Sequence, residues 1–327
     1  MNTNNFKIFK VNNNFAQKRI DRVLRAIFPK VPLSKIYQSL RTKKILLNNR
    51  KVKENTHVQE NDEIKIFLSD QWHIKKESPS KQLELLKKSN FYKKSLKILW
   101  EDEDLLVLDK PSGIPVHPGT NHYQGKTMID LASAYLQKAE FLPKLVHRLD
   151  IDTSGALLFA KNNLSLQNLN QQMREKQCTK KYYALVNGIY KKEQGTIRTK
   201  LERTNSKNKS TKIIIAKSNS KAKLAITHFK VEKKYQEQVS LMSVSLETGR
   251  MHQIRVHFKS QDHPLIGDDR YGDFSLNRQF KKQFDLKRIF LHAYFLSFSH
   301  PKNKKKIIIK SPLPPDLTQL LEKFTLQ

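Results

Sequence analysis

From Ile98 onwards, short apolar runs of strand length alternate with glycine, proline and polar turn residues. The first runs lie in ILWEDEDLLVLDKPSGIPVHPG, and further strands are predicted at 145–149, 156–160, 182–186, 224–231, 240–246 and 305–309. Apolar runs of this length between turn signals are typical of buried strands. We therefore predict an α+β protein whose larger part is a mixed, mostly antiparallel β-sheet flanked by helices and loops.

The first 67 residues follow a different pattern. Apolar residues at helical spacing predict two short amphipathic helices, one at 20–28 and one at 33–40. A small β unit follows, with strands at 45–47 and 64–66. Basic side chains line the other face of the first helix and the end of the second; they are Arg22, Arg25, Arg41, Lys43 and Lys44.

Residues 69–94 lose this periodicity and are rich in Lys, Ser and Gln, which is typical of a linker. We predict a small domain at 16–68, a linker at 69–94 and a large domain at 95–327. Within the large domain, the segment 191–223 has 11 basic and 2 acidic residues and is predicted to be a loop or insertion.

The chain has 62 Lys and Arg residues against 30 Asp and Glu, a formal net charge of +32. Such an excess attracts polyanions, so nucleic acid is the first partner class to consider. AT-rich coding bias is the alternative, because it adds lysines without adding a binding function. The chain shows no apolar run of membrane-spanning length, and its single cysteine, Cys178, excludes an intrachain disulfide or a cysteine-based zinc cluster. A monomer in a reducing cytoplasm, away from membranes, is the expectation.

Polar residues interrupt the apolar pattern most sharply in Leu145–Lys161, LVHRLDIDTSGALLFAK. Asp152 and Thr153 are predicted to bond nearby backbone in a turn. Asp150 differs because an apolar run precedes it directly, so its carboxylate would be partly desolvated and would require a cationic partner.

A possible cationic partner is Arg255, in the segment Val244–Phe258, VSLETGRMHQIRVHF. We predict a strand from His252 onwards, in which Arg255 points away from its apolar neighbours Ile254 and Val256. His252 and His257 would then lie on opposite faces, which argues against a shared metal ion. Taken alone, an arginine in such a position is more often a surface charge than a catalytic residue.

Five motifs, in order along 99–301, resemble those of the RluA family of pseudouridine synthases. They are KPSGIPVHPG, HRLDxxTSG, KKYYALVNG, TGRMHQIRVH with HPLIGDDRYG, and RIFLHAYFLSFSHP. Residues 18–67 resemble the S4 RNA-binding domain, although Asn49 and Asn61 stand where that domain usually has glycine. Asn tolerates the left-handed conformation well, so both turns remain feasible. The combination looks most like the RluC type, which modifies large-subunit (23S) ribosomal RNA.

The resemblance assigns roles residue by residue. The catalytic aspartate of the family falls on Asp150, its active-site tyrosine on Tyr182, and the arginine that pairs with the aspartate on Arg255. Tyr183 is an adjacent rival, but the family spacing of tyrosine, any residue, then alanine selects Tyr182. The arginine that displaces the target nucleotide falls on Arg148. Further RNA contacts are expected from Arg250 and His252, and from the five basic residues of the small domain.

The implied reaction is the isomerisation of specific uridines to pseudouridine in 23S ribosomal RNA or a precursor of the large subunit. It requires a flipped-out nucleotide and one carboxylate, acting as nucleophile or base, and neither a cofactor nor a metal ion. Two alternatives are a noncatalytic RNA-binding or ribosome-assembly factor and a metal-dependent nuclease. For the nuclease, the acidic stretch EDEDLLVLD is the nearest ligand source, but it is better interpreted as the start of a strand.

Overall fold

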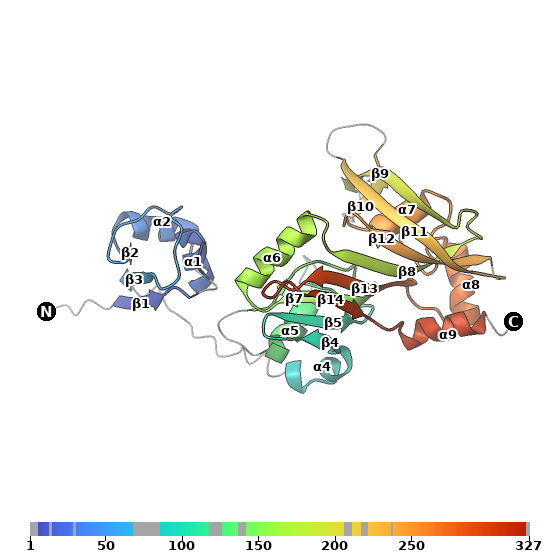
Figure 1. Ribbon diagram of the computed structural model, residues 1–327, viewed down its shortest axis with the longest axis horizontal. Coiled ribbons are helices and arrows are strands. Elements are labelled where there is room, and N and C mark those ends of the chain that lie inside the picture. The colour runs from blue at the N-terminus through green and yellow to red at the C-terminus, as the bar shows by residue number, and fades with distance from the viewer. Residues whose placement is uncertain are drawn as a thin grey trace. The chain divides into compact units, whose positions relative to one another are not determined.

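The computed structural model describes residues 6–12, 15–28, 31–67, 86–117, 126–136, 142–205, 211–216, 222–236 and 238–324. The chain divides into two compact units, one formed mainly by residues 1–80 and the other by most of the remaining chain (Figure 1). Most of the predicted linker, 69–85, lies outside the described residues. Its last part contains a helical turn at 86–88 and the beginning of α4 (Asn90–Ser95), which the Ser89 side chain caps at the Tyr92 amide.

The small unit packs two helices against a three-stranded antiparallel sheet. The helices are α1 (Ile20–Ile27) and α2 (Leu33–Arg41), and the strands have the order β1 (Phe6–Lys10), β3 (Glu63–Phe67), β2 (Ile45–Leu47). Ile20, Leu24, Ile36 and Ile64 are fully buried between these layers. The predicted helices and the two predicted strands are therefore present. Strand β1, on the other edge of β3, was not predicted.

Asparagine supplies the left-handed turns of the small unit. Asn49 and Asn61 have φ values of 60° and 69°, as predicted from their place at glycine positions. Asn48 also has a positive φ of 48°, and its side chain donates to Asp62 Oδ1 at 2.8 Å and accepts from the Glu63 amide at 2.7 Å. These side-chain bonds offset the steric cost of the left-handed backbone.

The large unit is built on one long mixed sheet with the strand order β10-β9-β11-β12-β8-β13-β7-β5-β4, while β14 pairs with β13 and β6 with β7. The strands are β4 (Ile98–Glu101), β5 (Leu105–Lys110), β6 (Lys144–Leu145), β7 (Ser154–Ala160), β8 (Thr179–Asn187), β9 (Gln194–Asn205), β10 (Thr211–Ile215), β11 (Lys223–Tyr235), β12 (Val239–Leu246), β13 (Leu291–Ser299) and β14 (Lys306–Lys310). Among the described strands only β7 and β13 pair in parallel. The mixed, mostly antiparallel sheet was predicted correctly.

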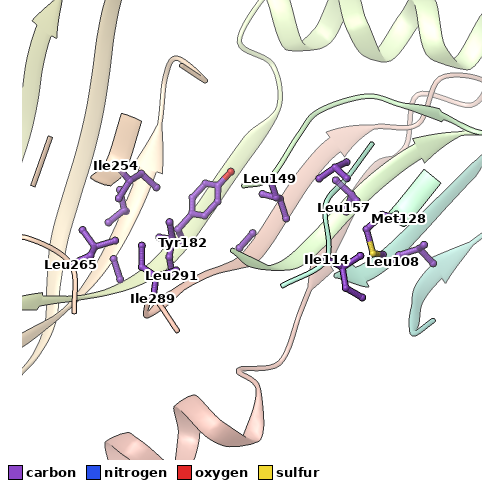
Figure 2. Packing of buried hydrophobic residues seen from close by; sticks show 14 of the residues in the cluster. Leu108, Ile114, Met128, Leu149, Leu157, Tyr182, Ile254, Leu265, Ile289 and Leu291 are labelled. Carbon is purple, nitrogen blue, oxygen red and sulfur yellow. The ribbon is translucent and has the colours of Figure 1, made fainter. Parts of the chain in front are cut away.

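Helices α5 (Met128–Leu136), α6 (Asn163–Arg174), α7 (Gln253–Lys259), α8 (Phe274–Phe284) and α9 (Pro315–Lys323) complete the large unit. The largest apolar cluster joins residues from distant strands, and Figure 2 shows Leu149 and Tyr182 lying among its members. The core thus fixes both the loop before β7 and the middle of β8. No helix within the described ranges is long and apolar enough to cross a membrane.

Three local predictions were wrong. The predicted strand at 145–149 ends at Leu145, after which the chain leaves the sheet. Segment 191–223, predicted as a loop or insertion, contains β9 and β10, in which buried Ile197, Leu201 and Ile213 alternate with exposed basic side chains. The segment after His252 is helix α7 rather than a strand. All residues from 253 to 258 are buried, so its sequence shows neither the helical nor the strand alternation of apolar and polar residues.

Gly155 permits a close approach of two backbone segments in the large sheet. Its φ is +114°, and a Cβ there would collide with the carbonyl oxygen of Ala293 and lie 2.7 Å from the carbonyl carbon, where β7 meets β13. We expect Gly155→Ala to lower the free energy of unfolding by about 2 to 4 kcal/mol, measured by urea denaturation. Gly113→Ala is the control, because Gly113 also has a positive φ of +81° but open space around it. Equal losses for the two variants would show that the contact with Ala293 is unimportant.

Candidate active site

The large unit contains a cleft of about 1140 Å³. Its lining includes the loop 145–153 before β7, the turn 249–255 leading into α7, and residues 287–289 before β13. Lys180 and Tyr182 of β8 line it as well. The walls combine apolar side chains with several cations, so the cleft suits an anionic ligand that has a flat apolar part.

Asp150 lies on the loop before β7, with 28% of its side chain exposed to the cleft. Buried Lys110 fixes the backbone of this loop, since its Nζ donates to the carbonyl oxygens of Pro111 at 2.9 Å, Ile151 at 2.6 Å and Thr153 at 2.8 Å. Burial lowers the pKa of Lys110 to about 7. The three hydrogen bonds of Lys110 stabilise the conformation of the loop that carries Asp150.

Arg255 reaches Asp150 from the first turn of α7. Its Nη1 lies 3.4 Å from Asp150 Oδ2, whereas its Nε and Nη2 donate to the two oxygens of Asp268 at 2.8 and 2.7 Å. Asp268 is fully buried and also accepts the amides of Arg270 and Tyr271, each at 2.9 Å. Burial opposes charge on both partners, but their mutual hydrogen bonds raise the pKa of Arg255 and hold the pKa of Asp268 below its usual value. The Arg255–Asp268 pair therefore presents one remaining guanidinium edge to Asp150.

His252 also approaches Asp150, with its Nε2 3.9 Å from Asp150 Oδ2. It precedes α7 in the left-handed conformation, with φ 54°, and its Nδ1 lies 2.9 Å from Tyr271 Oη. Tyr271 Oη already accepts the Ile213 amide at 3.0 Å, so its own proton is free to bond His252 Nδ1. Burial lowers the pKa of His252, which favours the neutral ring. In that form the remaining N–H is on Nε2 and faces the Asp150 carboxylate.

Tyr182 and Tyr183 point to opposite faces of β8. Tyr182 is buried and lines the cleft, and Figure 2 shows its ring between Ile254 and Leu149. Burial, and then the Asp150 charge, raise the pKa of its hydroxyl, so the phenol stays protonated. Tyr183 instead stacks on Tyr294 with ring centroids 3.9 Å apart. Because side chains alternate along the strand, Tyr182 lies in the cleft and Tyr183 does not.

Comparisons with known proteins identify the family of the chain. Residues 104–260, which include Asp150, Tyr182 and Arg255, match the RNA pseudouridylate synthase family model. Proteins called "Ribosomal large subunit pseudouridine synthase C" are similar over nearly their whole length: that of Buchnera aphidicola subsp. Schizaphis graminum is 38% identical, with 95% of each chain covered, and that of Escherichia coli K12 is 36% identical, with 98% of each covered. The chain belongs to the RNA pseudouridylate synthase family.

The fold of this pseudouridine synthase is also found in a solved structure. "Human RNA Pseudouridylate Synthase Domain Containing 4" superposes with a TM-score of 0.58 at 22% identity, covering 75% of this chain and 97% of the human chain. The resemblance to the RluA family and the prediction of an RNA pseudouridine synthase are therefore confirmed. The large-sheet fold expected from it is confirmed as well.

The other predicted contact residues are distributed between the two units. Arg148 and Arg250 are exposed and line the synthase cleft, with Arg250 Nε donating to the Leu224 carbonyl at 3.1 Å. The five basic residues predicted to contact RNA from the small unit are all exposed; they are Arg22, Arg25, Arg41, Lys43 and Lys44. All seven side chains are therefore accessible to a ligand.

The acidic stretch considered as a metal-binding site forms a turn. Asp102, Asp104 and His300 bring potential ligand atoms within 4.8 Å of one another. However, Asp102 Oδ1 accepts the amides of Asp104 and Leu105 at 2.8 and 2.9 Å, and Oδ2 lies 2.7 Å from His300 Nε2. The His300 Nδ1 accepts the Lys302 amide at 3.2 Å, so in the neutral ring Nε2 carries the proton and is no metal ligand. This group is best explained as the capped entrance to β5.

Sequence reasoning missed Asp268, Tyr271 and Lys110, although all three lie in quoted motifs. Each contacts a candidate site residue or the loop that carries one. Asp268 accepts from Arg255, Tyr271 bonds His252, and Lys110 donates to backbone carbonyls of the Asp150 loop. For Asp268 and Lys110, the available signal was a charged residue inside an otherwise apolar or glycine-containing segment. Such a signal predicts that the residue is buried, but it does not show which group the residue contacts.

Proposed function

We propose that this synthase converts specific uridines of large-subunit (23S) ribosomal RNA to pseudouridine. The observation behind this proposal is the 36 to 38% identity, over nearly full length, to proteins whose names specify the ribosomal large subunit. The same identity disfavours a noncatalytic RNA-binding or assembly factor. A cytoplasmic location follows from the proposed substrate.

In the proposed reaction the bond between ribose C1′ and uracil N1 breaks, the base turns, and a new bond forms between C1′ and C5. Asp150 supplies the carboxylate, either as nucleophile at the sugar or as base toward a ribose proton. Arg255 Nη1, 3.4 Å from Asp150 Oδ2, pairs with that carboxylate and orients it in the cleft. His252 Nε2–H, directed toward Asp150, is placed to donate to the same carboxylate or to the substrate.

The target base must leave its stack, because a stacked nucleotide hides its glycosidic bond. We propose that Tyr182 packs against the extruded uracil, since it is the aromatic ring nearest to Asp150 on the cleft face of β8. Exposed Arg148, two residues before Asp150, would occupy the space left in the RNA. Release of tritium from 5-labelled uridine in RNA tests the activity, and mapping of pseudouridines in ribosomal RNA with and without the gene identifies the sites.

For the small unit we propose an S4-type RNA-binding role. Its support is the basic helix pair, the following β unit, and the excess of 13 basic over 5 acidic residues within 18–67. Its five basic contact candidates are exposed, as docking on phosphates requires.

Neutralising Arg41, Lys43 and Lys44 with glutamine should weaken binding to ribosomal RNA and lower the slope of log K against log salt by about 2, because each phosphate contact contributes roughly 0.7 to 0.9. Affinity titrations at several salt concentrations measure this slope. The matched control neutralises Lys302, Lys304 and Lys305, three exposed lysines of the turn between β13 and β14. Equal effects of the two triple variants would favour the coding-bias explanation of the charge.

A further inference from the structure

We propose that Lys180 is a phosphate-binding residue of the cleft, contacting the RNA backbone beside the target nucleotide. The inference rests on the proposed function only for the identity of the anion. Lys180 stands on β8 and lines the cleft together with Tyr182.

Half-buried Lys180 differs from Lys110 and Lys161, two other poorly exposed lysines of the large unit, in its lack of hydrogen-bond partners among the described residues. Lys110 has three carbonyl acceptors, and Lys161 bonds the Glu101 carboxylate at 2.7 Å and the Asp102 carbonyl at 2.5 Å. Within the described part of the chain, no hydrogen bond or ion pair holds the Lys180 ammonium. Lys180 is half-buried, and a partly desolvated cation without a partner gains binding energy from a ligand that provides the missing negative charge.

No carboxylate of the described residues pairs with Lys180, although Asp150, Asp152 and Asp269 line the same cleft. Its Nζ lies against Gly249, only 3.6 Å from the position of a Cβ at that residue, and Arg250 follows directly with its side chain on the cleft wall. Burial lowers the pKa of Lys180, and the one group that raises it is the thiol of Cys178. The residues that the structure describes thus supply no counter-ion to Lys180, and the proposed substrate offers one anion, its phosphate.

The separation of Lys180 and Tyr182 along β8 matches the size of one nucleotide. Lys180 and Tyr182 alternate onto the same strand face and are separated by roughly 7 Å. If Tyr182 packs against the extruded uracil, the ammonium lies beside the base, within the span of the attached sugar and phosphate. Lys181 points to the opposite face, with its Nζ 5.5 Å from the Phe295 ring centroid. It is therefore a control with the same charge on the same strand.

The test compares full-length wild type, Lys180→Met, Lys180→Arg and Lys181→Met in RNA titrations at several salt concentrations. We expect Lys180→Met to weaken binding about 10-fold, since a charge-assisted hydrogen bond is lost, and to lower the salt slope by roughly 0.7 to 0.9. Lys180→Arg should keep the slope, and Lys181→Met should change affinity less than about twofold.

A second measurement separates ligand binding from a structural role. Removing an unpaired charge from a desolvated site should raise the melting temperature of Lys180→Met by roughly 2 °C near neutral pH. Because the pKa of Lys180 is lowered in the folded state, this gain should shrink as pH rises through the usual lysine range. A lower melting temperature would assign Lys180 a structural role and overturn the proposal. So would reduced turnover with an unchanged salt slope, which indicates contact with the neutral base.

These measurements keep two failures apart. If wild type binds RNA with a Lys180-dependent salt slope but releases no tritium from 5-labelled uridine, the proposed function fails and the anion site stands. If wild type is active and Lys180→Met matches it in affinity and slope, the anion site fails alone.

Discussion

Asp150→Asn should reduce pseudouridine formation by at least about 10³-fold while leaving RNA affinity within about twofold of wild type. The amide preserves the shape of the side chain but is neither a base nor a nucleophile. With 28% of the side chain exposed in the cleft, the amide should be tolerated without unfolding. Single-turnover tritium release and an RNA titration, run on the same preparation, measure the two quantities.

Asp152→Asn is the matched control for this experiment. Asp152 lines the same cleft two residues later but is exposed, and its backbone carbonyl, rather than its carboxylate, accepts the Ser112 hydroxyl at 2.8 Å. Its variant should retain activity within a few-fold of wild type. Activity of Asp150→Asn close to that of the control would refute the assignment of Asp150.

The fold was predictable wherever one face of an element is buried and the other exposed. In α1, buried Ile20, Val23 and Leu24 are followed by exposed Arg25, so the helical period is visible in the sequence. Helix α7 is buried on both faces, so its sequence does not show the helical spacing of apolar residues. Strand β7 is buried along its whole length as well, but flanking turn residues and its short run of apolar residues still identified it.

Tertiary contacts explain what the sequence could not provide at the site. The role of Arg255 came from the resemblance, and the wrong strand prediction around it did not affect that role. Its bidentate partner Asp268 lies on a loop after α7, and no periodicity connects the two residues. Lys110 is 41 residues from the Ile151 carbonyl that it clamps, so only the folded chain brings them together. Contacts of this kind depend on topology rather than on local pattern.

Arg255→Ala should combine a large loss of activity with a large loss of stability. It leaves the fully buried Asp268 carboxylate without its bidentate partner, which costs about 3 to 5 kcal/mol of unfolding free energy at neutral pH. In wild type, the pKa of Asp268 is held below its usual value, so the ionised carboxylate contributes to the free energy of unfolding. This contribution is fully present above the usual aspartate pKa range and is lost as pH falls through the pKa of the folded state. In the variant, burial without the cation favours the protonated acid, so the deficit should shrink on acidification. Urea unfolding at pH 7 and at about pH 4.5 measures this change.

The double variant Arg255→Leu with Asp268→Leu separates the two roles of Arg255. Replacing both members of a buried ion pair by apolar residues is often neutral, so part of the stability should return, although the Arg270 and Tyr271 amides lose their acceptor Asp268 Oδ1. Activity should not return, because Asp150 still lacks the guanidinium that lies 3.4 Å away in wild type. A stable and active double variant would mean that Arg255 supports only the fold, and that another group, such as His252 at 3.9 Å, is sufficient as a partner of Asp150.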